Sequence, residues 1–127
     1  MEQKPISELM NLSGKVVIVT GGAMGIGYAI ASRLAEAGAS VLIANLDAEK
    51  SSIAAAKLAE RGWNVSSTVA DVSDEGQVEA MVAKAVDEFG GVDILVNNAG
   101  IYPLKSVMEA TKEDFEKTIR VNLMGAF

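Results

Sequence analysis

The sequence lacks two residue types that carry much of enzyme chemistry, because its 127 residues include no cysteine and no histidine. Without them the chain can form no disulfide, no thiolate nucleophile, no imidazole base and no Cys/His zinc site. The Ser-His-Asp and Cys-His mechanisms are therefore excluded, and no metal site is expected. Any general base must be a carboxylate, a tyrosine, a lysine or a group of a bound cofactor.

Positive charge and long apolar runs are also scarce. The chain has 11 Lys and Arg against 17 Asp and Glu, a formal net charge of -6, and it has no basic run that could neutralise nucleic-acid phosphates. No apolar run approaches the roughly 20 residues that span a bilayer, and residues 1–12 lack the roughly 7–15-residue apolar stretch of a signal peptide. We therefore expect a soluble, cytoplasmic protein that binds neither nucleic acid nor membrane.

What the sequence does contain is an alternation of apolar runs and amphipathic stretches. Strands are predicted at Val16–Val19, Val41–Ala44, Asn64–Ala70 and Val92–Val96. Their starts are about 25 residues apart, the length of a strand plus a crossover helix. This pattern predicts an α/β fold with a doubly wound parallel sheet, truncated to about four strands in the order 3-2-1-4.

Helix starts are marked between these strands. Asp47 is a plausible N-cap for a helix from Ala48 to Arg61, and Ser73 is expected to cap the helix that Gly90 ends. The segment Thr111–Asp114 resembles a capping box. It opens a last helix with an apolar stripe at Phe115, Ile119, Leu123 and Ala126.

A glycine turn, TGGAMGIG at Thr20–Gly27, follows the first strand and opens a helix. Gly21 can supply the tight turn, Gly25 can let the backbone approach a pyrophosphate, and Gly27 can let the helix lie close to the strand. Free N–H groups near Gly25 and Ile26 would face the anion. A turn that only connects two elements is the alternative, but the flanking strand and helix favour a Rossmann-type dinucleotide site. No Gly-Lys-Ser/Thr end is present, which disfavours triphosphate hydrolysis.

Together with three later segments, this turn resembles the short-chain dehydrogenase/reductase family. The segments are Asp71-Val72, Asn97-Asn98-Ala99-Gly100, and Asn122 within Arg120-Val121-Asn122-Leu123. The resemblance implies that Asp71 hydrogen-bonds the adenine amino group and that Val72 flanks the ring. It also implies that residues 97–100 stabilise the sheet and line the adenosine ribose. Asp71 could instead cap the next helix, although Ser73 and Asp74 are better placed for that. A turn is the alternative for Asn97 and Asn98, and both roles can coexist.

Asn122 can also be interpreted without the family. It shares a helical stripe with Phe115, Ile119 and Ala126, and a buried amide is costly unless its hydrogen bonds are met. In the family the matching Asn holds a water in a proton relay with a Ser, a Tyr and a Lys. A structural Asn that bonds nearby backbone is an alternative of equal weight.

The rest of that catalytic set is missing. The family's Lys, four residues after its Tyr, lowers the phenol pKa from about 10. Here Tyr28 is followed four residues on by Ser32, and Tyr102 by Ser106. The chain ends at Phe127 inside a predicted helix that has no C-cap signal. We therefore expect a truncated half that shows no dehydrogenase turnover alone. We also expect it to form a homo-oligomer through an exposed strand edge and the last helix.

The end of the second strand bears on the choice of cofactor, NAD or NADP. Asn45 stands where NAD-preferring members of the family place Asp, so the charge that would repel a 2′-phosphate is absent there. No Lys or Arg follows at Leu46 or occurs in the glycine turn at residues 22–24. Asp47 either reaches the ribose or only caps the helix. We favour NAD.

The sequence thus predicts one dinucleotide-binding, partial Rossmann domain over residues 1–127, with residues 1–12 as an N-terminal extension. Its function would be that of the NAD(P)-binding half of an oxidoreductase that transfers a hydride between a nicotinamide cofactor and an alcohol or carbonyl compound. The alternative is a non-catalytic dinucleotide-binding or oligomerising module. A site for another adenine nucleotide or coenzyme is a weaker third hypothesis.

Overall fold

The structure, a computed structural model, describes residues 3–127 and is built on one parallel sheet. The strands are β1 (Val16–Thr20), β2 (Ser40–Asn45), β3 (Val65–Val69) and β4 (Ile94–Val96). They pair in parallel in the order β3-β2-β1-β4. The predicted α/β doubly wound sheet of four strands is therefore confirmed, together with its strand order.

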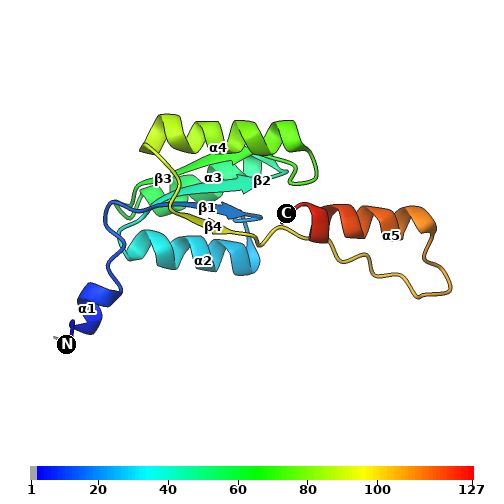
Figure 1. The fold of residues 1–127 in the computed structure, drawn as a ribbon, viewed down its shortest axis with the longest axis horizontal. Coiled ribbons are helices and arrows are strands. Elements are labelled where there is room, and N and C mark those ends of the chain that lie inside the picture. Colours follow the sequence, from blue (N-terminus) through cyan, green and yellow to red (C-terminus); the bar gives the residue numbers. More distant parts are fainter. Residues whose placement is uncertain (1–2) are drawn as a thin grey trace.

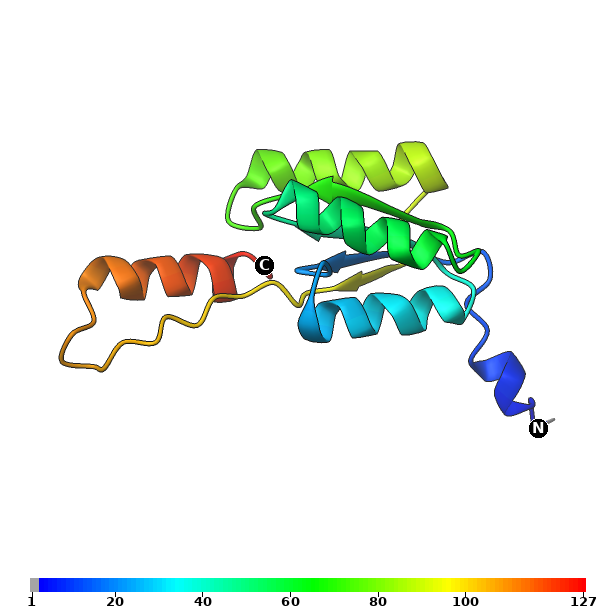
Figure 2. The ribbon, with the colours of Figure 1, turned by 180° about the vertical axis from the view of Figure 1, so that it is seen from behind.

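Helices cover both faces of this sheet (Figures 1 and 2). The helical elements are α1 (Ile6–Leu9), α2 (Gly25–Glu36), α3 (Ala48–Ala59), α4 (Glu75–Phe89), α5 (Lys112–Ile119) and the π-helix η1 (Arg120–Met124). Helices α2 and α3 pack on one face of the sheet and α4 packs on the other. Helices α1 and α5 extend away from this body at opposite ends (Figure 1). Of the expected N-terminal extension, Met1 and Glu2 lie outside the described residues.

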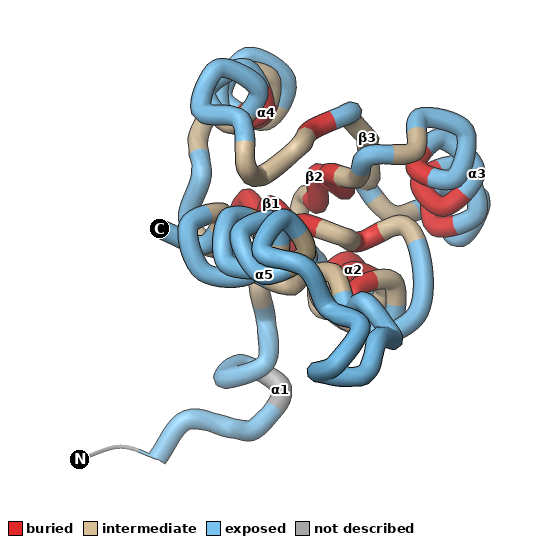
Figure 3. The backbone as a smooth tube through the Cα atoms, turned by 90° about the vertical axis from the view of Figure 1, so that its right-hand side faces the viewer, coloured by how far each residue is buried: buried red, intermediate tan, exposed pale blue. Residues whose placement is uncertain are grey.

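The core lies on the two faces of β1 and β2. Because successive strand residues point to opposite faces, Val17 packs in the cluster that α2 and α3 cover, whereas Ile18 packs with Met81 of α4. All five residues of β1 are buried. A strand buried on both faces reads as a continuous apolar run rather than an alternating one, which is why this strand was predictable. Figure 3 shows buried residues in the sheet and on the helices beside it, whereas α5 has none.

Two of the three predicted helix N-caps are confirmed. Asp47 caps α3, with its carboxylate accepting the Lys50 N–H at 3.0 Å, and Thr111 and Asp114 form the predicted capping box. The expected Ser73 cap is wrong, because the N-cap of α4 is Asp74, which accepts the Gln77 N–H at 3.1 Å. The Ser73 hydroxyl is directed instead to Asp71.

The fourth strand is shorter than predicted, beginning at Ile94 rather than at Val92. The cause lies in Asp93, whose backbone N–H donates to Val16 O at 2.9 Å while its carboxylate accepts the Val16 N–H at 2.8 Å. A side chain thus takes one hydrogen bond that a regular ladder would give to the backbone.

The last helix departs most from the expectation. The α-helix ends at Ile119 and continues as the wider turn of η1, closed by the Gly125 N–H to Arg120 O bond of 2.9 Å. An extra residue in a turn moves later side chains out of the i, i+4 line. The predicted stripe is not buried either: Phe115, which precedes the π turn, is 66% exposed, and Leu123 is 64% exposed. Within residues 3–127, no helix combines the length and apolar character needed to cross a membrane.

Candidate functional site

A cavity of about 570 Å³ opens at the carboxyl ends of the strands. The sheet side of the cavity is formed by Gly21 after β1, Asn45 at the end of β2, Asp71 after β3, and the Ala99–Gly100 segment after β4. Residues of α5 and η1 form the facing wall. β1 lies between β2 and β4. The chain adds β2 and β3 on one side of β1 and then crosses over to add β4 on the other side. In open α/β sheets, the crevice at such a switch point is the usual place of a ligand.

The glycine turn lies beside this cavity. Gly21 has φ +64° and Gly25 has φ +54°, conformations that favour glycine. A Cβ on Gly27 would collide with the Gly21 carbonyl oxygen and lie 2.5 Å from Asn98 Nδ2, so α2 can approach the turn only because residue 27 is a glycine. A Cβ on Gly25, in contrast, would meet nothing within 4 Å. Close helix packing thus depends on Gly27, while Gly25 faces open space.

The start of α2 has the donor set that an anion requires. The helix begins at Gly25, and its N-cap residue Met24 makes no side-chain cap hydrogen bond. The first N–H groups of a helix have no partner within the helix, and the dipole makes this end positive. The exposed backbone around Gly25 and Ile26 therefore offers hydrogen-bond donors of the kind that bind anions.

A buried hydroxyl ties the glycine turn to the end of β4. Thr20 is 2% exposed, and its Oγ1 accepts the N–H groups of Asn98 and Ala99, both at 3.1 Å, while donating to Val96 O at 3.2 Å. Asn98 Nδ2 donates back to Thr20 O at 3.0 Å and to Gly21 O at 3.2 Å. Asn98 therefore shapes the cavity without lining it. Thr20 was missed as a site residue, although its position directly before the glycine turn was a usable signal.

Asp71 has a defined local environment at the cavity. Its Oδ1 accepts the Ser73 hydroxyl at 2.7 Å and the Ser73 N–H at 2.8 Å. These two bonds are the main cause of its lowered pKa. Partial burial opposes this and raises the pKa, and the charges of Arg120 and then Lys117 make smaller contributions that lower it. Asp71 is therefore a carboxylate at neutral pH, and it does not cap α4.

The predicted site residues fall into two groups. Those that line the cavity are Gly21, Asn45, Asp71, Val72, Ala99 and Gly100. Those outside its lining are Gly25, Ile26, Gly27, Asp47, Asn97, Asn98 and Asn122. Of the two roles left open for Asp47, the structure has the cap of α3. Asn97 contacts the chain end instead, through a long hydrogen bond of 3.4 Å to Ala126 O.

Asn122 is exposed, contrary to the expectation of an amide buried in an apolar stripe. The stripe itself is exposed, because neither α5 nor η1 has a buried residue. Its Oδ1 accepts the Ile101 N–H at 2.8 Å and its Nδ2 donates to Ile101 O at 2.9 Å. Both polar groups of the amide are therefore satisfied by one residue of backbone. The geometry is that of a structural Asn that joins η1 to the segment after Gly100.

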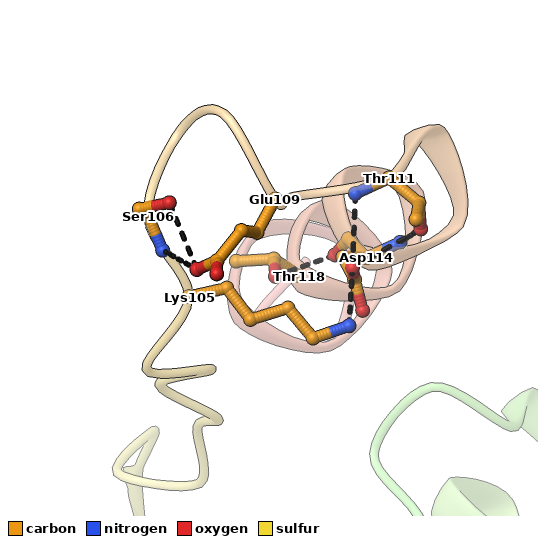
Figure 4. A network of polar contacts seen from close by, with 6 residues as sticks. All are labelled: Lys105, Ser106, Glu109, Thr111, Asp114 and Thr118. Carbon is orange, nitrogen blue, oxygen red and sulfur yellow. Dashed lines mark hydrogen bonds and ion pairs between the residues drawn. The ribbon is translucent and has the colours of Figure 1, made fainter.

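A second polar network lies at the start of α5, the helix that forms the wall of the cavity opposite the sheet (Figure 4). Asp114 Oδ2 accepts a hydrogen bond from Lys105 Nζ at 2.7 Å and another from the Thr111 N–H at 3.0 Å. The Lys105 bond is the main cause that lowers the pKa of Asp114 to about 2, with the Thr111 bond next. Glu109 accepts the Ser106 hydroxyl at 2.9 Å. The long segment between β4 and α5 is thus pinned to the first turn of α5.

Sequence comparison identifies relatives of this chain. The short chain dehydrogenase family model matches residues 15–127. An uncharacterized oxidoreductase of Thermotoga maritima is 48% identical over 116 residues, which cover 91% of this chain and 45% of that protein. The BbsD subunit of (2S)-[(R)-hydroxy(phenyl)methyl]succinyl-CoA dehydrogenase of Thauera aromatica is 40% identical, with coverages of 93% and 48%. 3beta-Hydroxysteroid dehydrogenase 2 of Eggerthella lenta is 43% identical, with coverages of 88% and 44%. The chain spans less than half the length of these relatives.

Proposed function

The chain belongs to the short-chain dehydrogenase family, and we propose that its cavity binds the adenosine part of a nicotinamide dinucleotide, with the diphosphate at the start of α2. One observation carries this proposal. The cavity at the switch point of the sheet lies beside a helix start whose N-cap residue provides no side-chain cap. When bound, the dinucleotide supplies the hydride chemistry, and the residues of this chain bind and orient it.

Each proposed contact follows from the placement of a residue. The Asp71 carboxylate accepts a hydrogen bond from the adenine amino group, and Val72, in the same loop, flanks the adenine ring. Asn45, Ala99 and Gly100 line the ribose, because they end β2 and follow β4 at the same edge of the sheet. The N–H groups around Gly25 and Ile26 bind the diphosphate. Asn98 and Gly27 hold the turn in shape and make no contact of their own.

We propose NAD rather than NADP as the preferred cofactor. The end of β2 offers Asn45 and Leu46, which provide no cation for a 2′-phosphate, and Asp47 is engaged as the cap of α3. Isothermal titration of the purified chain with NAD and NADP tests both proposals. The expected result is saturable binding with the smaller Kd for NAD. No saturable binding of either dinucleotide would overturn the proposed function, and a smaller Kd for NADP would overturn only the preference.

The parent activity is proposed to be hydride transfer between the dinucleotide and an alcohol or carbonyl compound. The support is that several relatives are dehydrogenases by name. The chain carries no Tyr-x-x-x-Lys, so we expect no turnover from it alone, and Asn122 is at most a remnant of the proton relay. A non-catalytic dinucleotide-binding module is the alternative. The cytoplasmic location expected from the sequence stays a prediction.

Self-association is a further proposal for this chain. Among the described residues β4 pairs only with β1, and its Leu95 is 51% exposed. Phe115 and Leu123 add exposed apolar surface on α5 and η1. Pairing of such surfaces between two copies removes them from water. Light scattering is expected to give a mass of at least a dimer at micromolar concentration. A stable monomer in dilute solution would contradict this.

A further inference from the structure

Two cationic side chains stand on the helical wall of the cavity. Lys117 lies on α5 and Arg120 opens η1, and both line the cavity. Residues three and four apart share one helix face, so Glu113, Lys117 and Arg120 are presented on the same side. Within residues 3–127 the ion pairs engage other Lys and Arg side chains. These two cations therefore face the cavity without a salt bridge in the described part of the chain.

The charge of the rest of the chain makes this placement consequential. The formal net charge is -6, and both phosphates of a dinucleotide are anionic, so the mean field of the protein opposes the approach of the ligand. The cavity itself adds the carboxylates of Asp71 and Glu113. A local positive patch can reverse such repulsion at the entrance of a site and raise the association rate.

The charges of Lys117 and Arg120 affect a carboxylate on the other side of the cavity. Ser73 accounts for most of the lowered pKa of Asp71, but Arg120 and Lys117 lower it further from the opposite wall. Both residues are exposed, so their charged groups remain solvated. Groups of this kind act over a distance and contribute little fixed contact energy, and salt screens their effect.

Building on the proposed function, we propose that Lys117 and Arg120 steer an anionic dinucleotide into the cavity and act on its association rate more than on its dissociation rate. No residue of the β2 end or the glycine turn contributes a cation to this cavity. Lys117 and Arg120 are the cationic side chains among the residues that line the cavity. The effect is expected to grow with the negative charge of the ligand, and so to be larger for NADPH than for NADH.

The test compares two double variants by stopped-flow fluorescence with NADH. The first variant, Lys117→Gln with Arg120→Gln, removes both cations from the cavity wall. The control, Arg33→Gln with Lys84→Gln, removes one arginine from α2 and one lysine from α4. The net charge therefore changes equally in the two variants. At about 20 mM salt, we expect the first variant to associate about fivefold more slowly than the second, and the difference to vanish near 0.5 M salt. Thermal unfolding by circular dichroism checks that both variants fold.

The outcomes separate the two proposals. Equal association rates in the two variants at low salt would overturn steering and leave the proposed function intact. A loss that persists at high salt, or that resides in the dissociation rate, would also overturn steering, because it would indicate a fixed contact. Failure of the unsubstituted chain to bind NADH would overturn the proposed function itself.

Discussion

Replacing Gly25 with valine is expected to weaken dinucleotide binding at least tenfold while the chain stays folded. A Cβ at residue 25 meets no atom of the chain within 4 Å and occupies open space where the diphosphate is proposed to lie. The valine side chain therefore clashes with the ligand and not with the rest of the chain. Each charge-assisted hydrogen bond lost to the diphosphate costs about 1.5–3 kcal/mol, and about 1.4 kcal/mol is a tenfold change in Kd. Titration calorimetry with NAD measures the loss.

Gly62 supplies a matched control for this substitution. It has φ +84°, also with nothing within 4 Å of an added Cβ, but it lies in the turn after α3, outside the cavity. A valine in the left-handed region costs about 1–3 kcal/mol of stability at either position. Gly62→Val is therefore expected to destabilise the chain to a similar degree and to leave the Kd unchanged. Equal Kd values for the two variants would mean that Gly25 does not face the ligand.

Replacing Thr20 with valine is expected to lower the free energy of unfolding by about 1–3 kcal/mol. Valine keeps the shape of the side chain, but the partly buried Ala99 N–H loses its acceptor, whereas the Asn98 N–H keeps its bond to Val96 O at 3.1 Å. A buried donor left unsatisfied costs about 1–3 kcal/mol. Urea unfolding at constant m-value measures the change.

Serine at position 20 separates the hydroxyl from the packing of the methyl group. Thr20→Ser keeps the acceptor, so it should retain most of the stability that Thr20→Val loses. It should also retain NAD binding, because the turn that carries Gly21 stays bonded to Asn98. A valine variant as stable as the parent would show that water or a shifted backbone satisfies the Ala99 N–H.

The parts of the fold that were predictable are those set by neighbours in the sequence. The continuous apolar run of β1 reports burial on both sheet faces, and Asp47 and Thr111 cap their helices through hydrogen bonds to residues three positions later. Adjacent candidates for one role were not separable, so Ser73 was chosen over Asp74 although its hydroxyl bonds Asp71. The late start of β4 depends on the Asp93 side chain reaching Val16, a contact 77 residues apart in sequence.

The site divides in the same way. Gly21 was predicted from the glycine turn that follows the first strand, whereas Asp71 and Gly100 were predicted from the resemblance to the family. All three line the cavity because each follows a strand at its carboxyl end, where parallel strands converge. Lys117 and Arg120 were not found, because only the tertiary placement of α5 brings them to the cavity. The apolar period predicts a buried stripe that includes Asn122, but α5 and η1 have no buried residue, so the period alone did not report burial.

The most direct test of the central claim is to map the ligand on the chain by NMR. In ¹⁵N-labelled protein, ADP-ribose is expected to shift the backbone amides of Gly21, Gly25, Asp71 and Gly100, while nicotinamide mononucleotide leaves Asp71 unshifted. Shifts confined to the separate hollow between α2 and α3, near Tyr28 and Lys57, would contradict the account, as would no saturable shifts with ADP-ribose. Saturable shifts around the cavity would establish that this chain binds the adenosine end of a dinucleotide at the carboxyl edge of its sheet.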